Sequence, residues 1–247
     1  MVKALEDIIA KSSSIVFFGG AGVSTESGIP DFRSTGGLYS QTYKYPPEMI
    51  VSHTFYEECP EEFFDFYKKR MLFMNAQPNA AHKKLAQLEK AGKLKAVITQ
   101  NIDGLHQAAG SKNVLELHGS VLRNYCESCG KSFPVKYVLE ADGVPHCDAC
   151  GGRVKPDVVL YEENLDMDVM EAAVNYISRA DMLIIGGTSL VVYPAAGLLR
   201  YYQGHKLVLV NKSNTSYDSR ADLVINENIG EVFSQIQGPY LDKAASE

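Results

Sequence analysis

The amino-acid sequence predicts an α/β fold built on a doubly wound parallel sheet, with two smaller insertions. Short apolar runs typical of strands buried on both faces recur along the chain, and helical patterns separate several of them. The runs cover residues 15–18, 95–99, 114–117, 181–186, 206–210 and 222–225, and the helical patterns cover 4–11, 80–91 and 168–179. At 247 residues, the chain is long enough for one large domain with a small satellite.

Two stretches break this alternation and divide the chain into domains. Residues 39–74 are rich in Tyr, Phe and Glu and contain two consecutive prolines, which predicts a helical insertion. Residues 123–155 are rich in Cys and Gly, which predicts a small inserted module. The large domain is then expected to comprise residues 1–38, 75–122 and 156–237, and residues 238–247 are expected to form a flexible tail.

The composition and the charge exclude several classes of protein. Hydrophobic residues make up 45% of the chain and charged residues 22%, as in globular rather than disordered proteins. With 30 acidic residues against 24 basic ones, we expect no broad binding to nucleic acid or to an anionic membrane. No apolar run approaches the roughly 20 residues that span a bilayer, and acidic residues near the start argue against a signal peptide. We therefore expect a cytoplasmic protein.

Four of the five cysteines form two pairs, Cys126-x-x-Cys129 and Cys147-x-x-Cys150, and a glycine follows each pair. The glycines allow the tight turn that aims two thiolates at one ion, and four thiolates suit a tetrahedral, structural Zn²⁺ site. The alternatives are four free thiols or two disulfides, and both carry little weight for a cytoplasmic protein. The module has no excess of basic residues, so we expect no direct contact with nucleic acid. Cys59 stands alone and is expected to be a buried, inert thiol.

A glycine-rich turn follows the first predicted strand, beginning with Gly-Ala-Gly at residues 20–22. Glycines at such a turn allow backbone N–H groups to approach a pyrophosphate. The third glycine comes late, at Gly28, so an ordinary strand-to-helix turn is the alternative. The loop then continues through a proline to Asp-Phe-Arg at residues 31–33, whose aromatic face and guanidinium suit a charged ligand.

Polar residues follow several other predicted strands, at the edge where open α/β sheets bind their ligands. Gln-Asn-Ile-Asp at residues 100–103 offers amide and carboxylate groups for a ribose or a carboxamide, with a simple turn as the alternative. Gly-Thr-Ser at residues 187–189 and Asn211 follow two further strands. His118 lies just past another strand and is the candidate general base, with His106 as its rival. Together, these strand ends predict a dinucleotide-binding crevice.

With these motifs in this order, the chain resembles the sirtuins, a family of NAD-dependent protein lysine deacylases, and in particular those of the bacterial type. The resemblance covers nearly the whole chain and implies a large Rossmann-like domain with a small zinc-ribbon module. It also implies that NAD is the cofactor, that Zn²⁺ is structural, and that acyl-lysine proteins or peptides are the substrates. We expect the chain to be a monomer.

The resemblance assigns roles to individual residues. The cofactor-binding residues are then Gly20, Ala21, Gly22, Thr25, Asp31, Phe32 and Arg33 on the pyrophosphate and ribose side, Gln100, Asn101, Ile102 and Asp103 on the nicotinamide side, and Gly187, Thr188, Ser189, Asn211 and Ile229 on the adenosine side. The catalytic residues are His118, Asn101 and Asp103, the substrate-binding residues include Val159, Tyr161 and Glu163, and the zinc ligands are Cys126, Cys129, Cys147 and Cys150.

The implied reaction yields nicotinamide, free lysine and 2′-O-acyl-ADP-ribose. The acyl-lysine carbonyl oxygen attacks C1′ of the nicotinamide ribose as nicotinamide leaves, aided by a geometry that holds the reactants close and dry. Asn101 and Asp103 keep nicotinamide in its pocket and order a nearby water. His118 then takes a proton from a ribose hydroxyl, a role typically worth about 100- to 10,000-fold in rate, so that the hydroxyl attacks the imidate. Water finally releases free lysine and 2′-O-acyl-ADP-ribose.

The chain departs from the usual sirtuin pattern at several positions. Gly19 replaces a threonine and Ser34 replaces a glycine. The pattern Val-Val-x-Phe-Gly-Glu becomes Val-Val-Leu-Tyr-Glu-Glu at residues 158–163, so that Tyr161 stands for phenylalanine and Glu162 for glycine beside the substrate strand. The change to Glu162 leaves the core chemistry untouched and concerns the choice of substrate.

The acyl group to be removed has two interpretations. Sirtuins that remove acidic acyl groups use a Tyr-x-x-Arg pair, and Tyr67 and Arg70 have this spacing and are candidate substrate-binding residues. A solvated basic helix face is an equally good interpretation of the same residues, and Glu162 would oppose an acidic acyl group. We therefore expect deacetylation and leave desuccinylation open.

Two alternatives to deacylation remain at this stage. One is transfer of ADP-ribose to a protein side chain on the same scaffold. The other is a non-catalytic NAD-binding or zinc-ribbon interaction module, which the joint presence of His118, Asn101 and Asp103 disfavours, because a protein that only binds NAD needs no base at the ribose.

Overall fold

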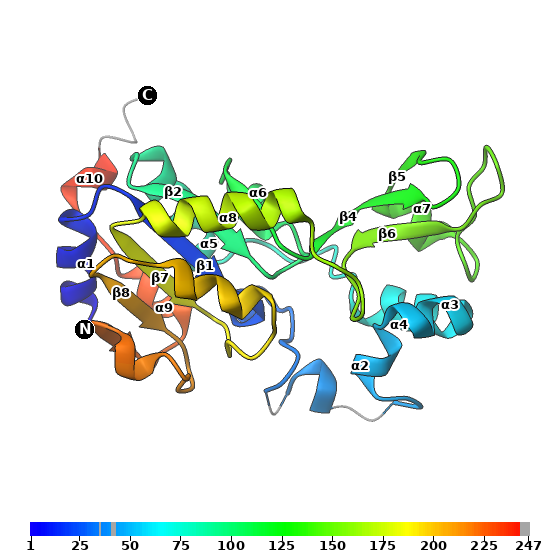
Figure 1. Cartoon of the computed structure of the whole chain (residues 1–247), viewed down its shortest axis with the longest axis horizontal. Coiled ribbons are helices and arrows are strands. Elements are labelled where there is room, and N and C mark those ends of the chain that lie inside the picture. The colour runs from blue at the N-terminus through cyan, green and yellow to red at the C-terminus, as the bar shows by residue number, and fades with distance from the viewer. Residues whose placement is uncertain (35, 41–42, 243–247) are drawn as a thin grey trace.

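The computed structural model describes residues 1–34, 36–40 and 43–242 and has two lobes of unequal size (Figure 1). The larger lobe contains a parallel sheet with the strand order β3-β2-β1-β7-β8-β9, and the smaller lobe contains an antiparallel sheet with the order β5-β4-β6. The predicted α/β fold is confirmed.

The parallel sheet consists of the six runs that the apolar pattern predicts. Its strands are β1 (Ile15–Gly19), β2 (Leu94–Thr99), β3 (Val114–Glu116), β7 (Met182–Gly186), β8 (Leu207–Val210) and β9 (Leu223–Ile225). Every residue of β1, β7 and β8 is buried, which explains the unbroken apolar runs. The strand order reverses direction between β1 and β7, and ligands of open α/β sheets bind beyond the carboxyl ends of strands at such a point.

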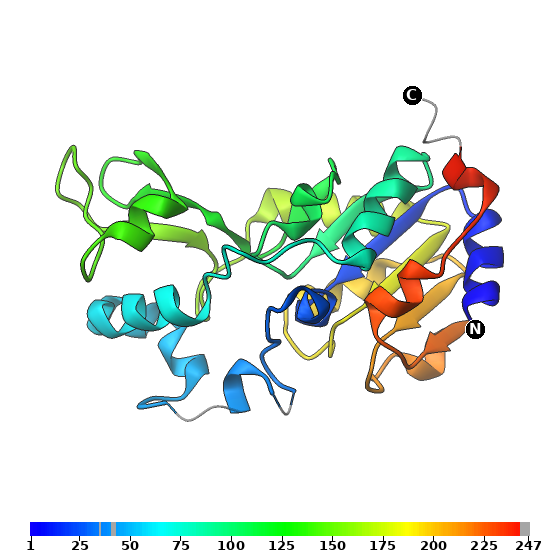
Figure 2. The ribbon, with the colours of Figure 1, turned by 180° about the vertical axis from the view of Figure 1, so that it is seen from behind.

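Helices cover both faces of the parallel sheet. On one face, α1 (Val2–Ala10), α5 (Ala80–Lys90) and α9 (Ile229–Ser234) enclose a core with β1, β2, β7 and β8, and Figure 2 shows α5 and α9 on this side. On the other face, α8 (Met167–Arg179) and the 3₁₀ helix η4 (Ala195–Tyr201) pack against the sheet (Figure 1). Side chains cap two of these helices: Asp166 accepts hydrogen bonds at the start of α8, and Asn79 does so at the start of α5.

Shorter helical elements connect the strands. They are α6 (Leu105–Ala108) and the 3₁₀ helices η1 (Ala21–Val23), η2 (Thr25–Ser27), η3 (Leu38–Ser40) and η5 (Asp218–Arg220). No helix in the described ranges is both long enough and apolar enough to cross a membrane.

The two predicted insertions form one lobe. It contains β4 (Gly119–Cys126), β5 (Ser132–Pro134), β6 (Val154–Val158) and α7 (Val135–Glu140) from the Cys-rich stretch, and α2 (Pro47–Ile50), α3 (His53–Glu58) and α4 (Pro60–Arg70) from the aromatic stretch. A single buried cluster joins aromatic rings of α3 and α4, such as Tyr56 and Phe63, to Val121 and Val154 of the small sheet. The small sheet also extends beyond the boundaries predicted at 123 and 155, because β4 begins at 119 and β6 ends at 158.

The end of the described chain differs from the predicted flexible tail. Residues Pro239–Asp242 form the short helix α10, and Tyr240 and Leu241 pack against the core that α1 and α5 enclose. The remaining tail positions, 243–247, lie outside the described residues.

Candidate active site

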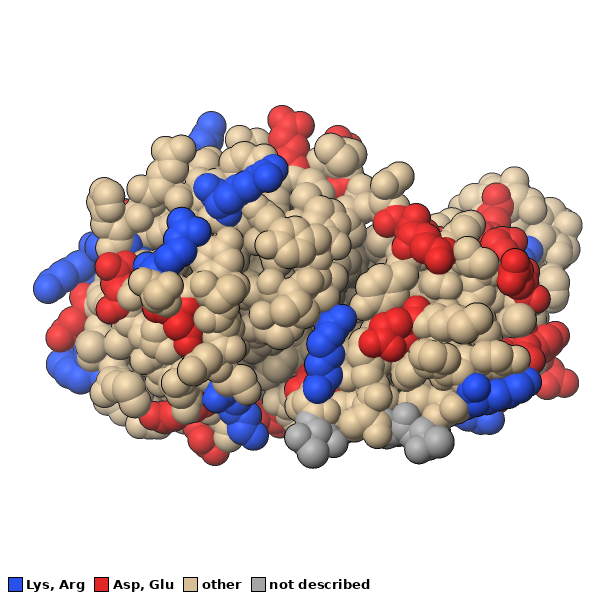
Figure 3. Space-filling view, turned by 60° about the horizontal axis from the view of Figure 1, so that its bottom comes forward, with Lys and Arg blue, Asp and Glu red and all other residues tan. Residues whose placement is uncertain are grey.

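A cavity of about 850 Å³ lies between the two lobes at the carboxyl ends of the parallel strands. Figure 3 shows the groove between the larger and the smaller lobe on the surface. The cavity is lined by every residue predicted to bind cofactor or to act in catalysis: Gly20, Ala21, Gly22, Thr25, Asp31, Phe32, Arg33, Gln100, Asn101, Ile102, Asp103, His118, Gly187, Thr188, Ser189, Asn211 and Ile229. Val159, Tyr161, Glu163 and Arg70 line it as well.

Tyr67 is the one predicted site residue, apart from the cysteines, that does not line the cavity. Its side chain is 1% exposed and stacks on Phe63, with ring centroids 5.8 Å apart, inside the core of the smaller lobe. Arg70, three residues later, does reach the cavity lining. Positions three apart lie on the same face of a helix, but the Tyr67 ring is packed in the aromatic core of the smaller lobe, so the Tyr-x-x-Arg spacing does not place both side chains in the cavity.

The glycine-rich turn after β1 packs directly on the turn after β7. A Cβ atom at Gly22 would lie 2.8 Å from the Gly187 Cα, closer than real side chains allow. Gly187 itself has φ of 59°, in the left-handed region that favours glycine. These glycines therefore bring the two strand-end backbones into contact and leave the cavity floor open to a ligand, which fits the close approach that a dinucleotide needs.

Hydrogen bonds between side chains and backbone hold the strand ends in place. Gln100 donates its Nε2–H to the Thr188 Oγ1 at 3.0 Å. Asn211 accepts the Thr188 backbone N–H and donates its Nδ2–H to the Thr188 carbonyl, both at 2.9 Å. The ends of β2, β7 and β8 are thereby fixed to one another.

Ser24 lies at the centre of a second network, below the predicted nicotinamide side. Its hydroxyl donates to the Asp103 Oδ2 at 2.6 Å and accepts the Asn101 Nδ2–H at 3.1 Å. The other Asp103 oxygen accepts the Leu105 backbone N–H at 2.9 Å. The His82 Nε2 lies 3.5 Å from the Ser24 hydroxyl. Asp103 and Asn101 are therefore held in fixed orientations at the cavity wall.

His118 has the geometry of a general base. Its Nδ1 lies 2.9 Å from the Gln100 carbonyl oxygen, and because a carbonyl only accepts, Nδ1 carries the proton in the neutral ring. Nε2 is then unprotonated and has no hydrogen-bond partner in the described part of the chain. Burial lowers the pKa of His118 from its ordinary value, outweighing the hydrogen bond to Gln100, which raises it. The ring is thus neutral at pH 7 and can accept a proton.

The rival histidine is not placed for this role. His106 is 1% exposed, does not line the cavity, and packs against His82 with ring centroids 4.7 Å apart. Neither of its ring nitrogens has a hydrogen-bond partner among the described residues, and burial lowers its pKa to about 3. His106 is therefore a neutral core residue, and His118 alone of the two faces the cavity.

The loop of residues 31–40, described except at residue 35, closes one side of the cavity. The Asp31 carboxylate accepts the backbone N–H groups of Arg33 and Ser34, and the Tyr39 N–H donates to the Phe32 carbonyl at 2.8 Å. The Phe32 and Tyr39 rings meet edge to face, with centroids 5.5 Å apart. The loop thus turns back on itself and presents its aromatic and guanidinium groups to the cavity.

The segment after β6 lines the opposite side. The backbone of Tyr161 donates to the Val51 carbonyl and accepts the His53 N–H, each at 3.0 Å. Glu162 has φ of 74°, which explains why the sirtuin pattern has glycine there. Its carboxylate accepts hydrogen bonds from the backbone N–H and the hydroxyl of Thr54, at 2.9 and 2.7 Å, at the start of α3. Glu162 is therefore engaged with the smaller lobe.

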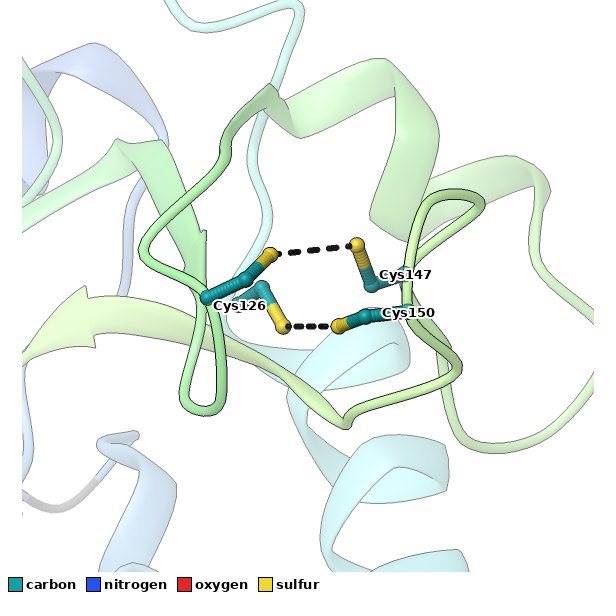
Figure 4. A group of neighbouring side chains, drawn as sticks. Cys126, Cys147 and Cys150 are labelled. Atoms are coloured by element: carbon teal, nitrogen blue, oxygen red, sulfur yellow. Dashed lines mark hydrogen bonds between the residues drawn. The ribbon is translucent and has the colours of Figure 1, made fainter.

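The four paired cysteines come together in the smaller lobe, and Figure 4 shows their side chains turned toward one another. Their sulfur atoms lie within 4.8 Å of one another, with Cys126 to Cys150 at 3.4 Å and Cys129 to Cys147 at 3.7 Å. A tetrahedral Zn²⁺ with Zn–S bonds of about 2.3 Å separates its sulfurs by about 3.8 Å, and a disulfide needs about 2.05 Å. The cluster fits zinc and is not a pair of disulfides. Cys59 is partly buried against the aromatic core.

Sequence reasoning missed three residues of this site. Ser24 stands in a run of small residues, and His82 lies far from the other motifs, so neither gave a local signal. Tyr39 belongs to the 31–40 loop but was not distinguished from the other tyrosines of that region. The late third glycine at Gly28 was the one clue that the turn after β1 is longer than usual.

The sheet, the open strand ends and the histidine base together have the features of a dinucleotide-binding enzyme with a metal module across the cleft. Residues 20–194 match the Sir2 family. A protein of Clostridium acetobutylicum named NAD-dependent protein deacetylase is 61% identical over 238 residues, covering 95% of this chain and 97% of that protein. A protein of the same name from Staphylococcus aureus is 46% identical over 237 residues, covering 95% and 97%. The chain belongs to the Sir2 family, the sirtuins.

Solved structures agree with this assignment. A complex described as Sir2–p53 peptide–NAD⁺ has a TM-score of 0.85 and 41% identity, covering 100% of both chains. A structure of Sir2Tm bound to a propionylated peptide has a TM-score of 0.85 and 40% identity, covering 100% of this chain and 99% of that chain.

Proposed function

We propose that this protein is an NAD-dependent protein lysine deacetylase. The reaction consumes NAD, an acetyl-lysine side chain and one water molecule, and it yields nicotinamide, free lysine and 2′-O-acetyl-ADP-ribose. NAD supplies the electrophilic C1′ carbon and the leaving group. The protein's own residues bind and orient the two substrates, keep water away from C1′ while nicotinamide leaves, and move a proton.

One observation carries the proposal: His118 exposes an unprotonated Nε2 in the same cavity that the Ser24, Asn101 and Asp103 network borders. A base in a site that only bound NAD would have no proton to take. Removal of a proton from a ribose hydroxyl makes that oxygen nucleophilic, and a base of this kind is most useful with a pKa near or below neutral pH. The relatives named NAD-dependent protein deacetylase support the same activity.

The cavity residues divide into roles that follow from their placement. Gly22 and Gly187 let the backbone approach a pyrophosphate, and the Arg33 guanidinium supplies a positive charge beside it. Asn101 and Asp103, fixed through Ser24, hold the carboxamide of nicotinamide. The segment of Val159 to Glu163 on the cavity wall pairs with an extended acyl-lysine peptide by strand addition.

Acetyl-lysine is the proposed substrate rather than succinyl-lysine. Recognition of a terminal carboxylate by a Tyr–Arg pair needs both side chains in the cavity, and Tyr67 is buried elsewhere. Glu162 adds a negative charge to the cavity lining.

The four-cysteine module has a structural role. Four thiolates complete the coordination of zinc and leave no position open for a substrate. Their sulfurs are too far apart for disulfides, which suits a reducing compartment such as the cytoplasm.

The test is a reaction of the full chain with NAD and matched peptides that carry acetyl-lysine, succinyl-lysine or unmodified lysine. Mass spectrometry follows nicotinamide and O-acyl-ADP-ribose. Equal amounts of nicotinamide and O-acetyl-ADP-ribose from the acetyl peptide alone are expected. Nicotinamide release with ADP-ribose attached to the protein or peptide would point to ADP-ribosyl transfer instead, and the absence of NAD cleavage would overturn the proposal.

A further inference from the structure

The Tyr161 hydroxyl joins the two sides of the cavity. It accepts a hydrogen bond from the Arg33 Nη2 at 3.3 Å and lies 3.2 Å from the Tyr39 hydroxyl. Arg33 and Tyr39 belong to the 31–40 loop, whereas Tyr161 belongs to the segment after β6. Tyr161 is thus the residue through which the loop is hydrogen-bonded to the proposed peptide-binding segment.

The side of the contact that carries Tyr161 is anchored on the smaller lobe. Its backbone N–H and carbonyl are both hydrogen-bonded, to Val51 and His53, so its ring is presented from a fixed backbone. The hydroxyl is the atom that phenylalanine, the residue expected here from the sirtuin pattern, would lack. The contact therefore depends on a single oxygen atom.

The loop side of the contact is a compact polar and aromatic cluster. The Arg33 guanidinium lies 5.3 Å from the Tyr39 ring centroid, a cation–π distance. No carboxylate in the described chain pairs with Arg33, so its charge remains available to an anionic ligand. Burial, with the hydrogen bond to Tyr161 next in size, raises the pKa of Tyr39, which keeps its hydroxyl neutral and able to donate. The guanidinium that the proposed function assigns to the NAD pyrophosphate is thus oriented by Tyr39 and Tyr161.

We propose that Tyr161 is a positioning residue whose hydroxyl latches the 31–40 loop to the peptide-binding segment and thereby couples peptide binding to NAD binding. The Tyr161 backbone is fixed already, but the residue is 37% exposed; a peptide that pairs with residues 159–163 covers its ring and restricts it to the orientation that holds Arg33 in place for the pyrophosphate. Because coupling between two binding sites is reciprocal, bound NAD strengthens peptide binding by the same factor. This inference rests on the proposed function for the identity of the two ligands, while the latch itself is a property of the chain.

The test is the Tyr161→Phe variant, which removes one oxygen and keeps the ring. The matched control is Tyr125→Phe: Tyr125 lies on β4 of the same lobe, is 36% exposed against 37% for Tyr161, and makes no hydrogen bond through its hydroxyl with any described residue. In the absence of ligand, hydrogen–deuterium exchange should be about 3- to 10-fold faster at the Leu38 and Tyr39 amides of the Tyr161 variant, because they close the loop onto Asp31 and Phe32. The control should match the wild type.

Binding and turnover then test the coupling. Calorimetric titration of NAD with and without acetyl-lysine peptide should show the coupling factor reduced about 3- to 10-fold in Tyr161→Phe, and KM for NAD should rise by a similar factor with kcat within about twofold. Tyr39→Phe should reduce the coupling as well, and the double variant should lose less than the product of the two single losses.

The outcomes separate the two proposals. Unchanged exchange at the loop in Tyr161→Phe would overturn the latch, whatever the enzyme activity. Faster exchange with an unchanged NAD–peptide coupling factor would overturn the coupling. A purely structural role for the hydroxyl would lower thermal stability and leave the coupling factor as in the wild type, and would overturn the proposal too. If the wild type does not deacetylate peptides and loop exchange is still faster in Tyr161→Phe, the proposed function is wrong but the contact between the loop and Tyr161 is supported.

Discussion

Replacement of His118 by alanine should separate the two halves of the proposed reaction. The step in which nicotinamide leaves needs no base at the ribose, whereas the later step requires Nε2 of His118 to take a hydroxyl proton. His118→Ala should therefore still bind NAD and still exchange labelled nicotinamide into NAD in the presence of acetyl peptide. It should form O-acetyl-ADP-ribose about 100- to 10,000-fold more slowly, the usual value of a general base.

The magnitude follows from what the structure shows of this side chain. A loss of 100- to 10,000-fold corresponds to about 2.7–5.4 kcal/mol of activation free energy. The substitution also removes the hydrogen bond to the Gln100 carbonyl, which costs about 1 kcal/mol of stability and leaves the folded state dominant. The midpoint temperature of thermal unfolding should therefore shift by only a few degrees, which shows that the slower reaction does not result from unfolding of the variant.

The assay measures two quantities by mass spectrometry: the O-acetyl-ADP-ribose formed in quenched reactions, and the exchange of labelled nicotinamide into NAD. His205→Ala is the matched control, since His205 is exposed and does not line the cavity. In the wild type, the acid limb of kcat/KM should fall below pH 6.5, because burial lowers the pKa of His118 and only the neutral ring accepts a proton. Wild-type product formation in His118→Ala, or loss of exchange and product together, would refute this reasoning.

Three further predictions concern the frame of the site. Chelation of zinc, or Cys126→Ser, should lower thermal stability and release one zinc per chain by elemental analysis, while Cys59→Ser should do neither. Burial lowers the pKa of His82 to about 4 and that of His106 to about 3. Between pH 6 and pH 4.5, the unfolded chain therefore binds more protons than the folded chain does. In this pH range, the free energy of unfolding should fall by about 1.4 kcal/mol per pH unit for each of the two histidines. Urea titrations followed by circular dichroism measure it. A His106→Leu variant whose free energy of unfolding depends on pH as steeply as that of the wild type would contradict this. Glu162→Ala and Glu162→Gly both lose the hydrogen bonds at the start of α3, but only alanine incurs the steric cost of the positive φ. The glycine variant should therefore be more stable than the alanine variant by about 1 kcal/mol. Equal unfolding midpoints of the two variants in urea would argue against backbone strain at this position.

Most of the larger lobe was predictable from the sequence, because burial on both faces forces a simple pattern. β1, β7 and β8 are buried at every position, and each appears in the sequence as an unbroken apolar run ending in glycine or a polar residue. The candidate site followed from the same argument, since parallel strands place all their carboxyl ends on one edge. The cysteine spacing predicted a cluster that the structure brings together.

The smaller lobe was harder to predict, and the reason is physical. Tyr56 and Phe63 are buried in one cluster with Val121 and Val154, residues that lie roughly 60 to 100 positions further along the chain, and no periodicity in the sequence indicates such a partner. The aromatic stretch and the Cys-rich stretch therefore appear as two insertions in the sequence and form one core in the structure. Ser24 was not predicted for a similar reason, because its role depends on the hydrogen bonds of its hydroxyl to Asp103 and Asn101 and not on a local sequence pattern.

The position of His118 follows from the way the chain passes between the two lobes. His118 lies between the end of β3 and Gly119, the first residue of β4, which crosses into the smaller lobe (Figure 1). Arg123 spans this crossing: its Nη1 donates to Glu116 of β3 and its Nε to Asp157 of β6, each at 2.7 Å. The proposed catalytic base therefore lies on the connection whose geometry both lobes determine. Because the loop contact through Tyr161 also spans the two lobes, the relative position of the lobes sets the base and the cofactor side together, which favours a reaction that proceeds only when both substrates are in place.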